Sequence, residues 1–197
     1  MLAKADLKAA IAGKNRGILA SRADKTAILS AIAKVEERNP TPKPLEAPAL
    51  LNGDWRLLYT TSKDLLGIDR FPILNLGQIY QSIRVAESKV YNIAEIVGVP
   101  LLEGLVSVAA GFEPVSDIRV KVRFERGVIG SQRLANYQTP SQFISQVQAT
   151  QKFPIYKAID FEINSENQKG WLEITYLDQD MRIGRGNEGS VFVLTRV

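Results

Sequence analysis

The hydrophobic pattern of the chain changes its period once. Up to residue 38, apolar positions recur at the three- and four-residue spacing of amphipathic helices. The first stripe consists of Ala3, Leu7, Ala10 and Ile11, and the second of Ile28, Leu29, Ile32, Ala33 and Val35. A capping pattern at 21–24 begins the second helix, and Pro40 disfavours helix at the residue before it. The pattern predicts a two-helix arm over residues 1–38 and a stiff, proline-rich linker over residues 39–50.

Beyond the linker the period becomes two, which is typical of strands with one buried face. The predicted strands are 54–61, 78–85, 89–97, 104–112, 117–125, 157–163, 171–178, 181–185 and 190–196. About eight to ten short strands with turn signals between them predict a mainly β, antiparallel barrel or sandwich over residues 51–197. The segment 131–154 is rich in Gln and Ser and poorly periodic, so we expect a long loop with room for one helical turn.

The amino-acid composition excludes several kinds of catalytic and metal-binding site. The 197 residues include no Cys and no His. This excludes disulfides, zinc sites built from Cys or His, Cys nucleophiles and triads that need an imidazole base. The stretch Gly184–Gly189 matches a G-x-G-x-x-G pattern, but no helix has room to follow it, so a hairpin turn is favoured over a dinucleotide site. We expect no catalytic residues, no metal and no cofactor.

The net charge of +4 lies entirely in the first 39 residues, which hold eight Lys and Arg against four acids. A basic stripe also follows one face of the strand at 117–125. Such charges favour an anionic membrane surface, or are simply solvated. Nucleic acid is disfavoured because no aromatic residues interleave with these bases. The candidate membrane-contact residues are Lys4, Lys8, Lys14, Arg16, Arg119, Lys121 and Arg123.

Trp55 opens the first predicted strand two residues after Gly53. This resembles the lipocalin signature, in which an Arg from the last strand covers a Trp at the barrel entrance. The candidates for that Arg are Arg182, Arg185 and Arg196. In this interpretation the pair is a structural cation–π contact that closes one end of the barrel.

A charged group interrupts the predicted hairpin at 175–189. Asp178 and Asp180 would share one strand face, and Arg182 follows at the same spacing. Opposite charges on one face most often neutralise each other, which predicts a salt-bridged structural cluster. Contact with the head group of a ligand is the alternative, and paired carboxylates for acid–base catalysis are the third.

Several stretches resemble the plastid lipid-associated proteins, also called PAP or plant and cyanobacterial fibrillins. They are Asn15-Arg16-Gly17, Asn39-Pro40-Thr41-Pro42, Leu51–Ser62 with Leu58-Tyr59-Thr60-Thr61-Ser62, Gly77-Gln78-Ile79-Tyr80-Gln81, and Thr175–Gly186 with Phe192-Val193-Leu194 after it. The family's acidic and basic C-terminal residues fall on Asp178, Arg182 and Arg185. Gln179 stands where an acid is common, and Met181 where Leu is common.

The resemblance implies a lipocalin-like barrel that associates with thylakoid membranes or lipid globules and binds carotenoids, prenylquinones or acyl lipids. The leading hypothesis is therefore a non-enzymatic protein that binds or sequesters such molecules and supports photoprotection. The alternatives are a peripheral coat protein of lipid surfaces without a ligand cavity, and an accessory protein in prenylquinone metabolism. The candidate ligand-binding residues are Trp55, Tyr59, Tyr80, Phe161 and Trp171 as apolar lining, and Asp178, Arg182 and Arg185 as polar handles.

Location is predicted from what the chain lacks. No apolar run approaches the ~20 residues of a membrane span. The N-terminus has neither a secretory apolar core nor the character of a transit peptide. We therefore expect the cytoplasmic side of the thylakoid membrane in a cyanobacterium, or the plastid stroma and plastoglobules if the chain is a mature plant form.

Overall fold

The computed structural model describes residues 2–62, 75–98, 103–164, 166 and 168–197. The helices are α1 (Leu2–Ile11), α2 (Arg22–Glu36), α3 (Pro48–Leu51) and α5 (Pro140–Ala149), with 3-10 turns at Pro44–Glu46, Val85–Glu87 and Asn187–Gly189. The strands are β1 (Gly53–Thr60), β2 (Asn75–Arg84), β3 (Lys89–Val97), β4 (Gly104–Pro114), β5 (Arg119–Ser131), β6 (Ala158–Glu162), β7 (Gly170–Leu177), β8 (Met181–Gly186) and β9 (Val191–Arg196). All nine predicted strands are present, and their ends differ from the predicted ones by a few residues at most places.

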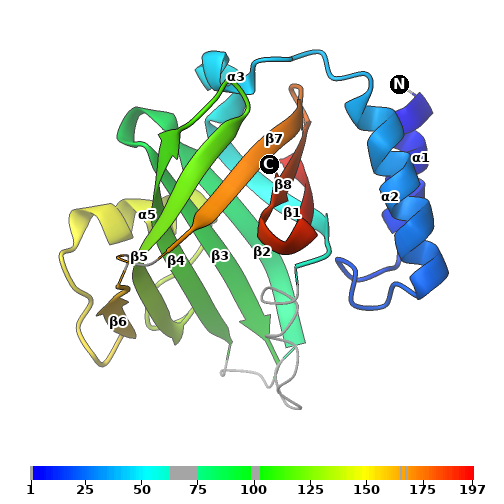
Figure 1. Ribbon diagram of the computed structural model, residues 1–197. Coiled ribbons are helices and arrows are strands. Elements are labelled where there is room, and N and C mark those ends of the chain that lie inside the picture. The colour runs from blue at the N-terminus through cyan, green and yellow to red at the C-terminus, as the bar shows by residue number, and fades with distance from the viewer. Residues whose placement is uncertain (1, 63–74, 99–102, 165, 167) are drawn as a thin grey trace.

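The strands form an antiparallel barrel (Figure 1). The sheet runs β4-β3-β2-β1-β9-β8-β7-β5, and β5 pairs again with β4, so these eight strands close into a ring. One edge of the long strand β5 pairs with β4, and its other edge pairs with two different strands. Residues 119–122 pair with β7, and residues 126–130 pair with β6. The wall is therefore continuous at one end, and at the other end β6 extends it outward from β5.

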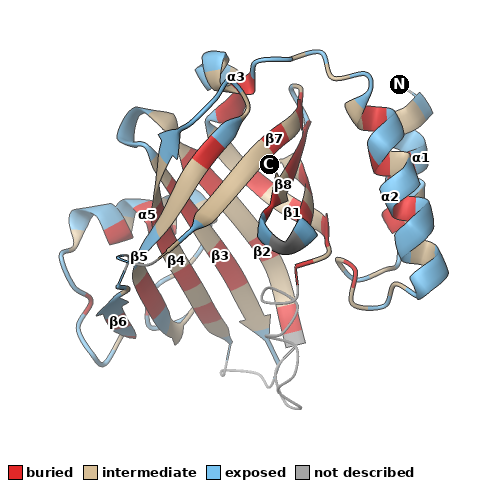
Figure 2. Cartoon of the chain, in the orientation of Figure 1, coloured by how far each residue is buried: buried red, intermediate tan, exposed pale blue. Residues whose placement is uncertain are grey.

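Buried positions recur along the strands and on the helices α1, α2 and α5 (Figure 2). Both faces of the wall carry apolar side chains, and they form three cores. The first lies inside the barrel and includes Trp55 and Leu57. The second lies between the outer face of β1, β7, β8 and β9 and the paired helices α1 and α2. The third lies between the outer face of β3, β4 and β5 and the helix α5. The arm is thus packed on the barrel and does not stand apart from it.

Two irregularities in the strands decide which face several side chains occupy. The pairing of β1 with β9 shifts between Leu57 and Tyr59. The pairing of β7 with β8 shifts between Ile174 and Tyr176. An extra residue at a bulge exchanges the two faces of a strand. Leu57 and Ile174 therefore point into the barrel, whereas Tyr59 and Tyr176 point outward under the helices.

Two segments differ from the sequence-based prediction. The expected loop at 131–154 contains the ten-residue helix α5, which begins after the N-cap Thr139 and Pro140. Its apolar stripe has only Phe143, Ile144 and Val147 within a run of Gln and Ser, which is too short to stand out as a period. The linker is not extended throughout, because it contains a 3-10 turn and the short helix α3.

The turn Asn15-Arg16-Gly17 joins the arm to β1. All three residues have positive φ, of 43°, 56° and 110°. The carbonyl oxygen of Arg16 accepts a hydrogen bond from the backbone N–H of Thr60 at 2.9 Å, and Arg16 forms a parallel bridge with Tyr59. A Cβ atom on Gly17 would lie 2.5 Å from the carbonyl oxygen of Thr60. Only glycine allows this close approach of the two backbones.

Gly17→Ala is therefore expected to destabilise the fold. The substitution adds left-handed strain, of order 1–3 kcal/mol, and also a clash with β1. Gly13→Ala is the matched control, because Gly13 has φ of 73° with nothing within 4 Å of the added Cβ. Urea unfolding should give a larger loss of unfolding free energy for Gly17→Ala than for Gly13→Ala. Equal losses would show that the contact with Thr60 does not matter.

Candidate functional site

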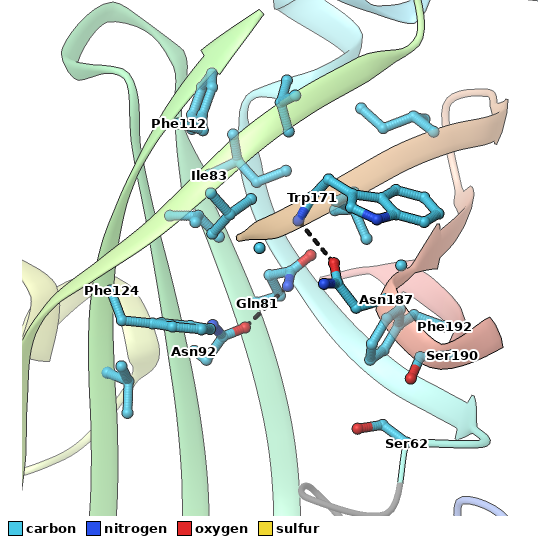
Figure 3. Close-up of a pocket in the computed structure, with 18 of the residues that line it drawn as sticks. Ser62, Gln81, Ile83, Asn92, Phe112, Phe124, Trp171, Asn187, Ser190 and Phe192 are labelled. Carbon is cyan, nitrogen blue, oxygen red and sulfur yellow. Dashed lines mark hydrogen bonds between the residues drawn. The ribbon is translucent and has the colours of Figure 1, made fainter. Parts of the chain in front are cut away.

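The barrel contains a cavity of about 680 Å³ (Figure 3). Most of its wall is apolar and comes from every strand of the ring except β1. The principal apolar lining residues are Leu51, Ile83, Val90, Val108, Phe112, Val120, Val122, Phe124, Leu172, Ile174 and Phe192. Gly170 and Gly186 also line it. A volume of this size matches a site for one small organic molecule.

A short polar row crosses this apolar wall. Gln81 on β2 and Asn92 on β3 are register partners, and Gln81 Nε2 donates to Asn92 Oδ1 at 2.9 Å (Figure 3). The guanidinium of Arg182 on β8 donates from Nη2 to Oε1 of Gln81. All three side chains line the cavity. The row therefore offers amide groups and one positive charge to a bound molecule.

Arg182 is among the most deeply buried side chains, at 2% exposure. In the described part of the chain its Nε has no hydrogen-bond partner, and no carboxylate forms a salt bridge with it. Burial, and secondarily the positive charge of Arg196, lower the pKa of Arg182 to about 9. Both causes act in the direction that disfavours the charged form.

Trp55 is fully buried beneath two guanidiniums. Its Nε1 donates to the carbonyl oxygen of Leu51 at 3.0 Å. The Cζ atom of Arg196 lies 4.3 Å from the ring centroid, and that of Arg182 lies 5.3 Å away. The predicted cation–π contact is therefore present, and it is made by both Arg196 of the last strand and Arg182. Arg185, the third candidate, does not take part.

Asp178 and Asp180 do not form the predicted cluster with Arg182. They lie in the turn between β7 and β8, so they do not share a strand face. Lys4 of α1 donates to Asp178 Oδ2 at 2.6 Å and also to Asp180. Arg185 faces outward as well, and its Nη2 lies 2.6 Å from Glu36 Oε2 on α2. These charges attach the arm to the barrel, and only Arg182 reaches the cavity.

The predicted aromatic lining is divided among different places. Trp171 lines the cavity, with the Arg119 guanidinium 4.5 Å from its ring centroid, while Trp55 lies in the core inside the barrel. Tyr59 lies under α1 and α2 because of the bulge in β1. Tyr80 packs on the outer face with the α5 core, and Phe161 is 42% exposed on β6. Of the five predicted aromatic residues, only Trp171 is thus among the residues that line the cavity.

Most of the predicted membrane-contact cations already have acidic or carbonyl partners. Lys14 Nζ lies 3.0 Å from Asp24 Oδ1. On β5, Arg119 Nη2 lies 2.6 Å from Glu173 Oε1, and Arg123 Nη1 lies 3.5 Å from Glu113 Oε1. Arg16 Nη2 donates to the carbonyl oxygen of Leu76, and Lys4 pairs with the β7–β8 turn. Lys8 stays 47% exposed at 3.9 Å from Asp180. Lys121 has no ion pair with a described residue.

The sequence analysis missed Gln81 and Asn92, and it missed three phenylalanines that line the cavity at 112, 124 and 192. A signal for Gln81 was present, since it lies between the inward positions Ile79 and Ile83. A polar residue in an apolar row marks a polar point on a buried face. Across the described segments, no group of three or more acidic side chains is placed to hold a metal ion.

The chain was compared with known protein families and proteins. The profile of the family described as PAP_fibrillin matches residues 1–195. This chain belongs to the PAP/fibrillin family. It is 34% identical to a cucumber (Cucumis sativus) protein named chromoplast-specific carotenoid-associated protein, across 93% of this chain and 64% of that one. It is 35% identical to the potato (Solanum tuberosum) light-induced protein, across 99% and 67% of the two chains.

A third relative is the probable plastid-lipid-associated protein 2 of Arabidopsis thaliana, which is 33% identical across 98% of this chain and 70% of that one. This PAP/fibrillin chain therefore spans about two thirds of the length of the relatives that it matches. All three relatives are named as chloroplastic or chromoplastic proteins. No solved structure matches the chain significantly. Within the described residues, no helix is both long and apolar enough to cross a membrane.

Acid should weaken the attachment of the arm through Asp178. Burial alone would raise the pKa of Asp178, but hydrogen bonds from Lys4 and Tyr176 outweigh it and hold the pKa well below its ordinary value. The resulting stability is present above about pH 4 and is lost as the pH falls toward the lowered pKa. In urea unfolding, Asp178→Asn should be less stable at neutral pH and should lose less stability on acidification than the wild type.

Asp6→Asn is the control for this experiment, because Asp6 is exposed on α1 and forms no ion pair with a described residue. It should keep the acid profile of the wild type. An unchanged profile for Asp178→Asn would contradict the role assigned to the Lys4–Asp178 pair.

Proposed function

We propose that this PAP/fibrillin protein binds one hydrophobic small molecule inside its barrel. The observation that carries the proposal is the cavity of about 680 Å³, whose wall is mainly Val, Ile, Leu and Phe. An eight-stranded barrel has an interior that is either filled by its own side chains or able to hold one small ligand. Gly170 and Gly186, which have no side chain, and Val108, which has a short one, also line the cavity.

The ligand classes that fit are carotenoids, prenylquinones and acyl lipids, because each presents a long apolar surface to such a wall. The names of the relatives support this choice, since one is called carotenoid-associated and another plastid-lipid-associated. We infer a non-enzymatic role in holding such molecules, in support of photoprotection. The site of action would be the thylakoid or lipid-globule surface, on the cytoplasmic side in a cyanobacterium or on the stromal side in a plastid.

Filling the cavity should abolish binding without unfolding the protein. Val108 is half-buried and lines the cavity, so Val108→Phe places a ring in the ligand's space. The same change at Val115, which is 64% exposed, is the matched control. Protein purified from a photosynthetic host would be examined by native mass spectrometry and organic extraction. We expect stoichiometric apolar ligand in the wild type and in Val115→Phe, and little in Val108→Phe. A wild type that carries no ligand and takes up none would count against the proposal.

A second candidate function, peripheral contact with a lipid surface, is favoured by an exposed apolar surface around β6. It consists of Ile129, Ile155, Tyr156, Ile159 and Phe161, of which Ile155 is 88% exposed. Ile159 pairs with Ile129, and the Phe161 ring lies over Gly127. Val128, between those two positions on β5, faces the α5 core on the outer side. Ile129, Ile159 and Phe161 therefore lie on the side that faces the cavity, where Ile163 lines it.

This β6 surface would place the cavity next to the lipid from which its ligand comes. Lys152 and Lys157 flank Ile155 and Tyr156 in the sequence. Apolar side chains flanked by Lys are the combination that binds anionic lipid interfaces. Lys8 and Lys121, which keep exposed or unpaired charge within the described structure, would add long-range attraction. Within the arm, Lys4 pairs with the β7–β8 turn and Lys14 pairs with Asp24 of the arm itself.

Ile155→Ser combined with Ile159→Ser should reduce binding to vesicles that contain phosphatidylglycerol. Burial of one such side chain contributes about 1.5–3 kcal/mol, so we expect about a tenfold or larger loss in flotation. Val115→Ser removes an exposed apolar side chain from the hairpin between β4 and β5 and is the control. If both variants float like the wild type, the β6 surface is not the contact.

A further inference from the structure

We propose that the ligand of the barrel carries a carboxylate and that Arg182 binds it inside the cavity. The inference rests on the proposed function and deepens it, because it selects one chemical class among the hydrophobic molecules that the cavity could hold. That class is an apolar chain with one terminal carboxylate, of which fatty acids and acidic isoprenoids are the two sources.

The positive charge of Arg182 has no counter-ion among the described residues. Arg182 is 98% buried, lines the cavity and forms no salt bridge with a described residue. Its Nη2 donates to Gln81, while its Nε is buried without a partner among the described residues. A buried cation is costly unless it is paired and its N–H groups are used. A carboxylate in the cavity would supply the missing charge and acceptors.

Arg182 differs from its neighbour Arg196, which contacts the same Trp55 ring. Arg196 donates from Nε to the carbonyl oxygen of Gln179 at 2.8 Å and from Nη1 to that of Asn52 at 2.9 Å. Its Nη2 donates to the carbonyl oxygen of Leu50. All three nitrogens are thus used in closing the end of the barrel. Arg182 also lies over Trp55, at 5.3 Å, but among the described residues only its Nη2 has an acceptor, the side-chain oxygen of Gln81, and a bidentate carboxylate would use the rest of its guanidinium.

The residues around Arg182 suit a carboxylate with an apolar chain. Gln81 and Asn92 continue the polar row from Arg182, and their amides can donate to a carboxylate. The rest of the lining is apolar and suits a hydrocarbon chain. Burial, and secondarily the positive charge of Arg196, lower the pKa of Arg182, and a bound anion would act in the opposite direction. A carotene or a quinone fills the same space but leaves the positive charge without a counter-ion.

The test uses pairs of probes that share one apolar chain and differ in the head group, which is a carboxylate in one and neutral in the other. cis-Parinaric acid and its methyl ester share one acyl chain, and retinoic acid and retinol share one isoprenoid skeleton. At neutral pH the free acids are ionised. Fluorescence titration should show the wild type binding each acid that it accepts about tenfold or more tightly than its neutral partner, which corresponds to about 1.4 kcal/mol. The probe pair that binds identifies the source.

Arg182→Met keeps the length and apolar packing of the side chain and removes its charge. This variant should bind the acid and the neutral partner equally. Arg185→Met is the matched control, because Arg185 lies on the same strand but faces Glu36 on the outside. It should keep the preference for the acid. Arg182→Lys, which retains the charge without the planar fork, should keep part of the preference.

The outcomes separate this inference from the proposed function. If the wild type binds acids and neutral partners equally well, the carboxylate is wrong and the cavity function stands. If no probe binds and none competes with a native ligand, the proposed function itself fails. The comparison in the wild type needs no variant, so the inference can be overturned even if Arg182→Met does not fold.

Discussion

The closure of β5 onto both β4 and β7 is the constraint on which the rest of the molecule depends. Without it the eight strands would be an open sheet with two unpaired edges. With it, their inward side chains surround one space. Because β5 turns from β7 to β6 along its length, the ring is held by only four pairs on that side, 119–122 with 170–173. The same strand therefore closes the barrel and makes the place where β6 departs from its wall.

A closed wall with apolar residues on both faces needs cover on the outside. The helices α1 and α2 supply it on one side, and α5 supplies it on another. The charges of the arm follow from this arrangement. Lys4 forms an ion pair with Asp178 in the β7–β8 turn, and Glu36 on α2 forms one with Arg185 on β8. Pairs of this kind, partly exposed, contribute modestly to stability but fix the position of a helix on a surface. Some of the positively charged side chains of the arm therefore form ion pairs within the protein.

The interior is specialised by a few polar residues in an apolar wall. Trp55 and the two arginines above it close one end, and of these arginines only Arg182 faces the cavity without its own set of carbonyl acceptors. A side chain of this kind reduces the stability of the empty barrel. A leucine at the same position would fill the space at lower cost, and the proposed carboxylate ligand would offset the cost of the arginine. The exposed apolar side chains of the β6 surface likewise do not stabilise the fold by burial.

The sequence by itself determined the class of structure. The change of period after residue 38, the nine strands, the two helices of the arm and the Trp–Arg contact all depend on neighbours within a few residues or on a short motif. The tertiary structure alone decided which side chains line the cavity. Tyr59 and Tyr176 follow the expected alternation until one extra residue at a bulge moves them outward. Asp178 meets Lys4, 174 residues away in sequence, because the arm folds back over the barrel. Whether Arg182 would have a carboxylate partner depended on every element around it. Periodicity records only local alternation, whereas bulges, closure and long-range pairing are settled by the packing of the whole chain.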